Sequence, residues 1–180
     1  MNQEPTSQWF AIRTRQASRA EVELSLVCDE VLYPTEEVKT PDVKGRVKAV
    51  IPNVLFIKTT MENALSLEKA GREHPERSIP FWIYRYPKDN RIQSIPESSI
   101  HLLRLLTADD KTKCEIFTKT DFKEDQPVHI TGGPFAGYTG HVVRVKKNRH
   151  VVVRIEGVCL VLLPFIHPDF LQPINDRIFV

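Results

Sequence analysis

Residues 132–140 read GGPFAGYTG, and this stretch holds four of the seven glycines in the 180-residue chain. Glycine reaches positive φ without steric cost, so such a cluster marks backbone geometry that a Cβ atom would oppose. It is typical either of a phosphate-binding loop at the start of a helix or of a tight connection between two strands. The neighbouring sequence distinguishes these two structures.

Segments in which apolar and polar residues alternate flank the glycine-rich stretch on both sides. Residues 128–131 (VHIT) precede it, and residues 142–146 (VVRVK) and 151–155 (VVVRI) follow it. A period of two is typical of half-buried strands. The helix and the Lys-Ser/Thr pair of a phosphate-binding loop do not follow the glycines. The stretch therefore predicts a connection between strands of a small β-barrel, which we expect to span residues 127–174.

The first part of the chain predicts strands and helices in alternation. Runs rich in β-branched, aromatic and aliphatic residues predict the strands. These runs are WFAIR at 9–13, EVLY at 30–33, VLFIK at 54–58 and IPFWIYRY at 79–86. With three expected helices between and after them, they predict an α+β domain over residues 8–106, in which helices pack on a mixed sheet.

Capping boxes mark the start of two expected helices. Ser18 and Glu21 have the spacing of an N-cap residue and its N3 partner, and they predict a short helix. Thr59 and Glu62 repeat this spacing and predict a second helix, which Gly71 would end as a C′ residue.

Three further segments complete the expected organisation. A third helix is predicted over residues 97–106, behind Pro96. Residues 107–126 hold six acids against four lysines and few bulky apolar groups, so they predict a linker between two domains. The polar residues 36–48 predict a loop or a hairpin around Gly45.

Composition is ordinary for a water-soluble globular protein, with a formal net charge of only +2. The opening MNQEPTSQWF lacks the apolar core of a secretory signal. The longest apolar run, VCLVLLPFI at 158–166, is broken by Pro164 and is too short to span a bilayer. We therefore expect a cytoplasmic protein that does not act at a membrane.

The sequence shows no pattern typical of catalysis or metal binding. Cys28, Cys114 and Cys159 are widely spaced, which argues against a disulfide framework and against a zinc site. We interpret them as buried or incidental thiols rather than as a catalytic cysteine with a distant histidine. The strings HExxH, GxSxG and GxxxxGK[ST] do not occur. We predict a protein that is not an enzyme and binds no cofactor.

Residues 128–157, VHITGGPFAGYTGHVVRVKKNRHVVVRIEG, resemble a KOW motif. In that motif a strand leads into a GPF-x-G-x-x-G loop and a second strand, and Gly140 corresponds to the central glycine. KOW domains are small SH3-like barrels of ribosomal proteins and of NusG/Spt5-type transcription elongation factors. The resemblance therefore implies an SH3-like fold for residues 127–174.

Motifs in the first part of the chain resemble the N-terminal domain of NusG. They are Trp9-Phe10, Tyr33-Pro34-Thr35 and the run from Ile51 to Phe56. The Pro-Asn-x-Leu-Phe form within this run is similar to the specialised paralogues, RfaH and the UpxY-type antiterminators of capsule loci. With the KOW motif, the resemblance covers nearly everything from residue 8 to residue 174.

For the first domain, the resemblance implies docking on the coiled-coil clamp helices of RNA polymerase and suppression of pausing and termination. A sheet face that the helices leave open would receive the helix pair. Core packing is the alternative for each apolar strand residue, and it is the expected role of Phe56. The implied polymerase-binding residues are Phe10, Ile12, Tyr33, Ile51 and Pro52.

Four polar residues surround the first strand–helix turn, where RfaH-type proteins read the non-template DNA strand. They are Arg13, Arg15, Gln16 and Arg19. Arginine side chains grip phosphates and stack on unpaired bases. We therefore interpret these residues as a binding site for non-template DNA or nascent RNA, with a solvated charged turn as the alternative.

The KOW region carries a basic and an apolar surface. Its basic residues fit either an RNA backbone or a solvated barrel face; they are Arg144, Lys146, Lys147, Arg149 and Arg154. A small barrel cannot bury every apolar residue of the run 158–166, so part of this run is expected to face a partner. Family analogy offers a ribosomal protein, a termination factor or the chain's own first domain. The expected partner surface comprises Phe135, Gly140, Leu160, Leu162, Phe165 and Ile166.

The resemblance thus predicts an operon-specific, NusG-like antiterminator that acts on elongating RNA polymerase. The alternative is a KOW-type RNA-binding or ribosome-associated protein whose first domain has another role. The three motifs of the first domain favour the antiterminator.

Overall fold

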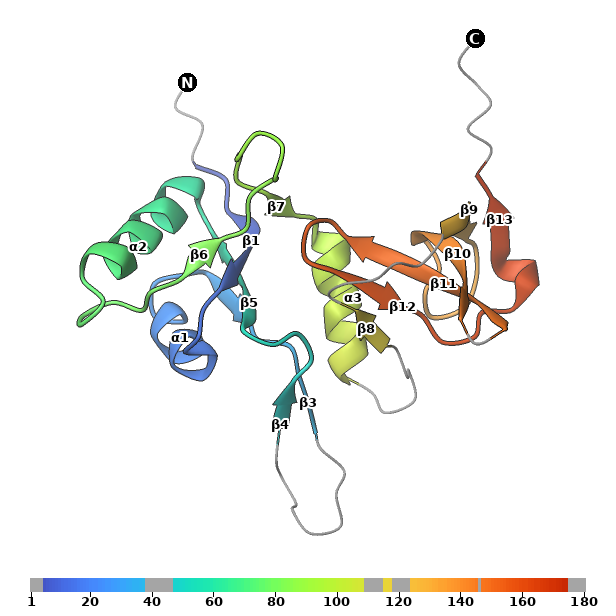
Figure 1. Cartoon of the computed structure of the whole chain (residues 1–180), viewed down its shortest axis with the longest axis horizontal. Coiled ribbons are helices and arrows are strands. Elements are labelled where there is room, and N and C mark those ends of the chain that lie inside the picture. The colour runs from blue at the N-terminus through green and yellow to red at the C-terminus, as the bar shows by residue number, and fades with distance from the viewer. Residues whose placement is uncertain (1–4, 38–46, 109–114, 118–123, 146, 175–180) are drawn as a thin grey trace. The chain divides into compact units, whose positions relative to one another are not determined.

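The chain folds into two compact units, Met1–Thr107 and Ala108–Val180 (Figure 1). The computed structural model describes residues 5–37, 47–108, 115–117, 124–145 and 147–174. Three residues named above, Gly45, Cys114 and Lys146, lie outside the described residues. Of the helices in the described residues, none has the length and apolar character that crossing a membrane requires.

An antiparallel sheet in the strand order β2-β5-β1-β6 forms the centre of the first unit, with β7 also paired to β1. The strands are β1 (Gln8–Arg13), β2 (Glu30–Leu32), β5 (Val54–Thr59), β6 (Trp82–Ile83) and β7 (Ser94–Ile95). Every described pairing is antiparallel, which corrects the expected mixed sheet. β1 and β2 run in the same direction, but β5 lies between them.

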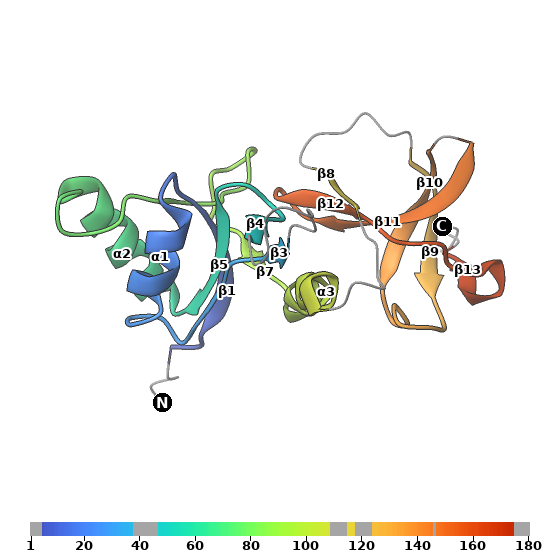
Figure 2. The same ribbon diagram turned by 90° about the horizontal axis from the view of Figure 1, so that it is seen from below.

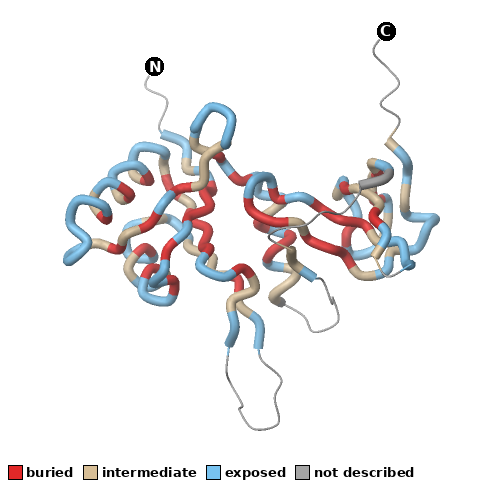
Figure 3. Tube along the Cα trace, in the orientation of Figure 1, coloured by how far each residue is buried: buried red, intermediate tan, exposed pale blue. Residues whose placement is uncertain are grey.

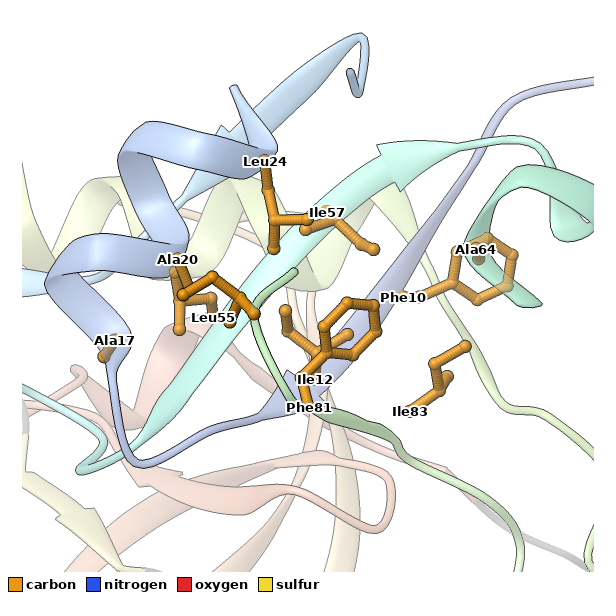
Figure 4. Close-up of a cluster of buried hydrophobic side chains, with 11 residues drawn as sticks. Phe10, Ile12, Ala17, Ala20, Leu24, Leu55, Ile57, Ala64, Phe81 and Ile83 are labelled. Atoms are coloured by element: carbon orange, nitrogen blue, oxygen red, sulfur yellow. The ribbon is translucent and has the colours of Figure 1, made fainter. Parts of the chain in front are cut away.

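Helices lie on both faces of this sheet (Figure 2). α1 (Ala17–Leu24) and α2 (Met61–Glu73) cover one face, and α3 (Glu97–Ala108) lies on the other. Successive strand residues point to opposite faces. Phe10 and Ile12 therefore enter the core beneath α1 and α2 (Figure 4), whereas Trp9 donates from Nε1 to Glu97 Oε2 of α3 at 2.8 Å. The two central strands are consequently buried on both faces (Figure 3).

Both predicted helix caps differ from the observed ones by one or two residues. α1 is capped by Gln16 without a side-chain hydrogen bond, and Ser18 is exposed within the helix. Thr60 caps α2, because its Oγ1 accepts a hydrogen bond from the Asn63 N–H at 3.2 Å. Thr59 instead ends β5 and is buried, and its Oγ1 accepts from Asn63 Nδ2 at 2.8 Å. Burial of the strand end thus moves the cap to the next residue.

Gly71 lies inside α2, so the prediction that it ends the helix is wrong. The reason for glycine at this position is steric. A Cβ atom built on Gly71 would lie 2.1 Å from the carbonyl oxygen of Ile79. α2 therefore packs directly against the backbone that leads into β6, and a side chain would prevent this approach.

A hairpin precedes β5, and its strands are β3 (Thr35–Glu37) and β4 (Val47–Ala49). This pairing confirms a hairpin where the sequence predicted a loop or a hairpin. The Val50 N–H then donates to the carbonyl of Pro34 at 2.9 Å, which closes the base of the hairpin.

The second unit is a six-stranded antiparallel sheet in the order β13-β9-β10-β11-β12-β8. Its elements are β8 (Glu115–Phe117), β9 (Glu124–Ile130), β10 (Thr139–Val145), β11 (Asn148–Ile155), β12 (Cys159–Leu162), the 3-10 helix η1 (Pro168–Phe170) and β13 (Leu171–Pro173). The glycine-rich stretch joins β9 to β10, as predicted. A Cβ atom on Gly140 would lie 2.5 Å from the carbonyl oxygen of Val152 in β11, so close strand contact requires glycine there. β8 and the start of β9 fall within residues 107–126, where the sequence predicted a linker. β8 belongs to the second sheet, because it pairs with β12.

We predict that Gly71→Ala lowers the free energy of unfolding by about 1–3 kcal/mol, as overpacking of a tight contact does. Alanine has the better helix propensity, but a backbone oxygen at 2.1 Å cannot move aside as a flexible side chain does. Urea denaturation of the full chain measures the change. Ser66→Ala, at an exposed position of the same helix, is the matched control and should be neutral or slightly stabilising. A Gly71→Ala variant as stable as Ser66→Ala would contradict the steric explanation.

Candidate functional site

The predicted polymerase-binding residues do not form one accessible surface. Phe10 and Ile12 are fully buried beneath α1 and α2, which corrects the expectation that they line an open sheet face. The alternation of β1 points both side chains toward the helices. Tyr33 is half-buried against the same core, and burial together with the charge of Glu21 raises the pKa of its hydroxyl. Of these three side chains, only that of Tyr33 is partly accessible.

Residues Ile51 to Val54 form a tight turn before β5. The Val54 N–H donates to the Ile51 carbonyl at 3.4 Å, and Asn53 has a positive φ of 63°. Since the ring of Pro52 fixes its φ near about −65°, this is a type II turn, which favours proline followed by glycine or asparagine. Ile51 is only 1% exposed, whereas Pro52 and Asn53 are exposed. This segment, the Pro52 turn, presents its Pro-Asn pair outward and is anchored by Ile51.

The four residues predicted to bind nucleic acid run from the end of β1 through the connecting turn to the start of α1, and all four are exposed. Arg19 Nε pairs with Glu23 Oε1 at 2.6 Å, and its Nη1 donates to Gln16 Oε1 at 3.2 Å. Exposed pairs of this kind contribute little to stability. Arg13 and Arg15 make no ion pair with any acidic residue in the described part of the chain. We call the segment that carries these four residues the arginine turn. It offers the guanidinium groups of Arg13 and Arg15 to an anionic ligand.

Thr14, which sequence reasoning did not single out, joins the arginine turn to its surroundings. Its side chain is buried, and its Oγ1 donates to the Pro80 carbonyl at 2.8 Å and accepts from the Gln16 N–H at 3.2 Å. Its backbone N–H donates to the carbonyl of Asn53 at 3.0 Å. The arginine turn, the Pro52 turn and the segment entering β6 are thus held side by side.

Glu68 of α2 closes the outer edge of β6, and sequence reasoning missed it as well. Its Oε1 accepts from the Ile83 N–H at 2.7 Å and from Arg85 Nη1 at 3.0 Å, and its Oε2 accepts from Arg85 Nη2 at 2.6 Å. Burial alone would raise the pKa of the Glu68 carboxyl. Hydrogen bonds from Arg85 and Ile83, with the charges of Arg85 and Arg72, hold the pKa below its ordinary value. The carboxylate is therefore ionised and already bound.

The predicted partner surface of the second unit divides between core and surface. Phe135, Gly140 and Leu162 are buried, which corrects the expectation that they face a partner. The close β10–β11 contact encloses Gly140, and Leu162 packs in a core cluster with Val143 and Val152. Leu160 is half-buried and borders a cavity of about 280 Å³ that Phe117 also lines.

Phe165 and Ile166 line a separate apolar groove of about 230 Å³ in the second unit. Phe165 is 73% exposed, and Ile166 is half-buried. The groove also contains Arg149 and His150, whose buried Nδ1 has no hydrogen-bond partner among the described residues. An occupant of this groove would meet apolar surface beside the exposed Arg149.

The described residues contain no cluster of three or more His, Cys, Asp or Glu side chains that would hold a metal ion. Burial, with the charge of Asp29, raises the pKa of Cys28 to about 11, and burial raises that of Cys159 to about 12. Both thiols are therefore protonated near neutral pH, and a thiol in that form is a poor nucleophile.

Comparison with known proteins identifies the family of this chain. The NusG family model, described as transcription termination factor nusG, matches residues 7–104. The match covers more than half of the chain and all five strands of the first sheet. The chain belongs to the NusG family, whose members are non-enzymatic regulators of transcription elongation.

A search of curated proteins finds no match. Among solved structures, one described as the crystal structure of the MjSpt4:Spt5 complex in conformation B is 19% identical in sequence. The match covers 93% of this chain and 97% of the chain in that structure, with a TM-score of 0.26.

Replacing Glu68 with glutamine should lower the free energy of unfolding near neutral pH by about 1–3 kcal/mol, because the Arg85 charge loses its partner. It should also weaken the dependence of stability on pH. A lowered carboxyl pKa contributes stability that is present above the ordinary value of 4.5 and is lost as the pH falls through the folded-state pKa.

Urea denaturation of wild type and Glu68→Gln at about pH 7 and about pH 3.5 tests both effects. The control is Glu73→Gln, which removes an exposed charge paired with Lys69 at 4.0 Å. If wild type and Glu68→Gln lost the same stability on acidification, Glu68 would not be the titrating group that we infer.

Proposed function

We propose that this protein is a specialised NusG paralogue, of the kind represented by RfaH and the UpxY-type antiterminators. In this proposal it binds elongating RNA polymerase in the cytoplasm and suppresses pausing and termination at particular operons. The observation that carries the proposal is the NusG family match over residues 7–104, which includes an exposed Pro-Asn pair on a type II turn. The Pro-Asn-x-Leu-Phe form of this segment is the one that resembles the specialised paralogues.

Docking on the clamp helices is assigned to the Pro52 turn and the neighbouring Tyr33. The hydrogen bond from the Val50 N–H to the Pro34 carbonyl brings these two segments together at the base of the β3–β4 hairpin. Proline and the buried Ile51 side chain fix the turn before a partner binds. A pre-ordered contact loses less conformational entropy on association than a flexible loop does.

Nucleic-acid binding is assigned to the arginine turn. Thr14 holds this turn beside the Pro52 turn, so a protein docked on polymerase through one would present the other to a nearby strand. Non-template DNA and nascent RNA both supply the phosphates and unpaired bases that arginine recognises.

For the second unit, we propose an SH3-like barrel of the KOW type that binds a protein through the groove at Phe165 and Ile166. Support comes from the strand–loop–strand arrangement around the GPF sequence and from the exposure of a phenylalanine at an apolar groove. A ribosomal protein or a termination factor is the proposed class of partner.

One observation favours RNA binding as a second function of this unit. Arg144 and Arg149 lie directly opposite each other on β10 and β11, and both are exposed. Like charges opposite each other destabilise an antiparallel pair, and a polyanion would relieve this repulsion. Such binding is the basis of the alternative function, a KOW-type RNA-binding or ribosome-associated protein.

Pro52→Glu should weaken binding of the purified full chain to core RNA polymerase by at least about 10-fold, because a glutamate at an apolar contact would be desolvated without a partner. Pro75→Glu, which changes an exposed proline between α2 and β6, is the matched control and should bind like wild type. Circular dichroism establishes that both variants are folded. Equal affinity of Pro52→Glu and Pro75→Glu would exclude the Pro52 turn from the contact. Failure of the folded wild type to bind would overturn the polymerase proposal.

A further inference from the structure

Trp82 is the one large aromatic side chain of the described first unit that is mostly exposed. It is 59% exposed in the edge strand β6, whereas its neighbours Phe81 and Ile83 are buried in the core. The other tryptophan of the chain, Trp9, is 2% exposed and hydrogen-bonded to Glu97. The Trp82 indole is therefore the tryptophan side chain that is accessible to a partner.

The strand register places Trp82 next to the arginine turn. Trp82 is directly opposite Arg13 in the antiparallel pairing of β1 and β6. Side chains of directly opposite residues lie on the same face of a sheet, with Cβ atoms about 4.5–5.5 Å apart. The hydrogen bond from Thr14 Oγ1 to the Pro80 carbonyl fixes the same two segments a little further along. Arg13, Arg15 and Trp82 are therefore carried by one continuous part of the fold.

A cavity of about 260 Å³ lies at the same edge of the sheet, and Trp82 contributes to its lining. It is lined by Glu68, Arg72, Phe81, Trp82, Arg85 and Asn90. The carboxylate of Glu68 is taken up by Arg85 and the Ile83 N–H. Arg72 forms no ion pair within the described residues, so two guanidinium groups outweigh one bound carboxylate. This edge of the sheet thus carries cationic groups and hydrogen-bond donors, in addition to Arg13 on the face that Trp82 shares.

We propose that Trp82 is a stacking platform for one unpaired base of a single-stranded nucleic acid whose phosphates contact Arg13 and Arg15. This inference rests on the proposed nucleic-acid binding by the arginine turn and adds the group that recognises a base. An aromatic face beside a cationic backbone track is the combination that binds single strands with little sequence preference. A duplex keeps its bases stacked on one another, so it offers the arginines phosphates but offers Trp82 no free base.

The two tryptophans make this proposal measurable by intrinsic fluorescence of the full chain. Oligo-dT, oligo-U and duplex DNA are titrated separately at low salt. We expect both single strands to quench tryptophan emission and the duplex to leave it unchanged. Trp82→Phe should lose the quenching, because the buried Trp9 is then the only emitter, yet it should keep most of the affinity because phenylalanine still stacks. Trp82→Ala should lose affinity by about 10-fold or more.

Leu26→Ala, which removes another exposed apolar side chain, is the matched control and should bind like wild type. The stacking role would be overturned if single strands bound the wild type without changing its emission and bound Trp82→Ala with undiminished affinity. Salt-dependent binding in that case would still support the arginine turn as the phosphate contact. Equal quenching by duplex and single strands would also refute stacking on a free base. No binding of any oligonucleotide by the folded wild type would overturn both the inference and the nucleic-acid binding on which it rests.

Discussion

The hydrogen bonds of one buried residue, Thr14, hold together the three segments that form the proposed interface. Its hydroxyl donates to the carbonyl of Pro80, and its backbone N–H donates to the carbonyl of Asn53. Each segment carries exposed groups, but its position is set by the sheet beneath it. A recognition surface supported in this way keeps its geometry better than one built on independent loops. The arrangement also explains why two proposed contacts, one to a protein and one to a nucleic acid, lie side by side.

The edge of the sheet depends on a second constraint, the close approach of α2. Gly71 lets the helix reach the backbone at Ile79, and Glu68 from the same helix accepts the N–H of Ile83. An edge strand otherwise presents unpaired backbone groups that invite association with other chains. With its outer N–H satisfied, the short β6 displays Trp82 without becoming a site of strand addition. Packing inside the unit thus determines what its surface offers to partners.

The sequence predicted the central strands, the three helices of the first unit and the strand-forming character of the second. Local patterns placed the helix starts one or two residues away from the observed ones. For α2, burial of Thr59 at the end of β5 moved the N-cap to Thr60. Phe10 was expected at an interface because a single strand does not reveal which face its helices cover. The sequence did not reveal the roles of Thr14 and Glu68, since the Pro80 carbonyl lies 66 residues from Thr14 and the partners of Glu68 lie 15 and 17 residues away. The role of Trp82 depended likewise on a register that only the folded sheet defines.

The most direct test of the central claim is transcription through an intrinsic terminator by purified RNA polymerase, with and without the full chain. The family description names a termination factor, whereas the specialised paralogues that this chain resembles act against termination. Our account predicts more full-length transcript when the protein is present on a template that recruits it. Increased termination, or no change while the protein is bound to the elongating enzyme, would contradict the antitermination role.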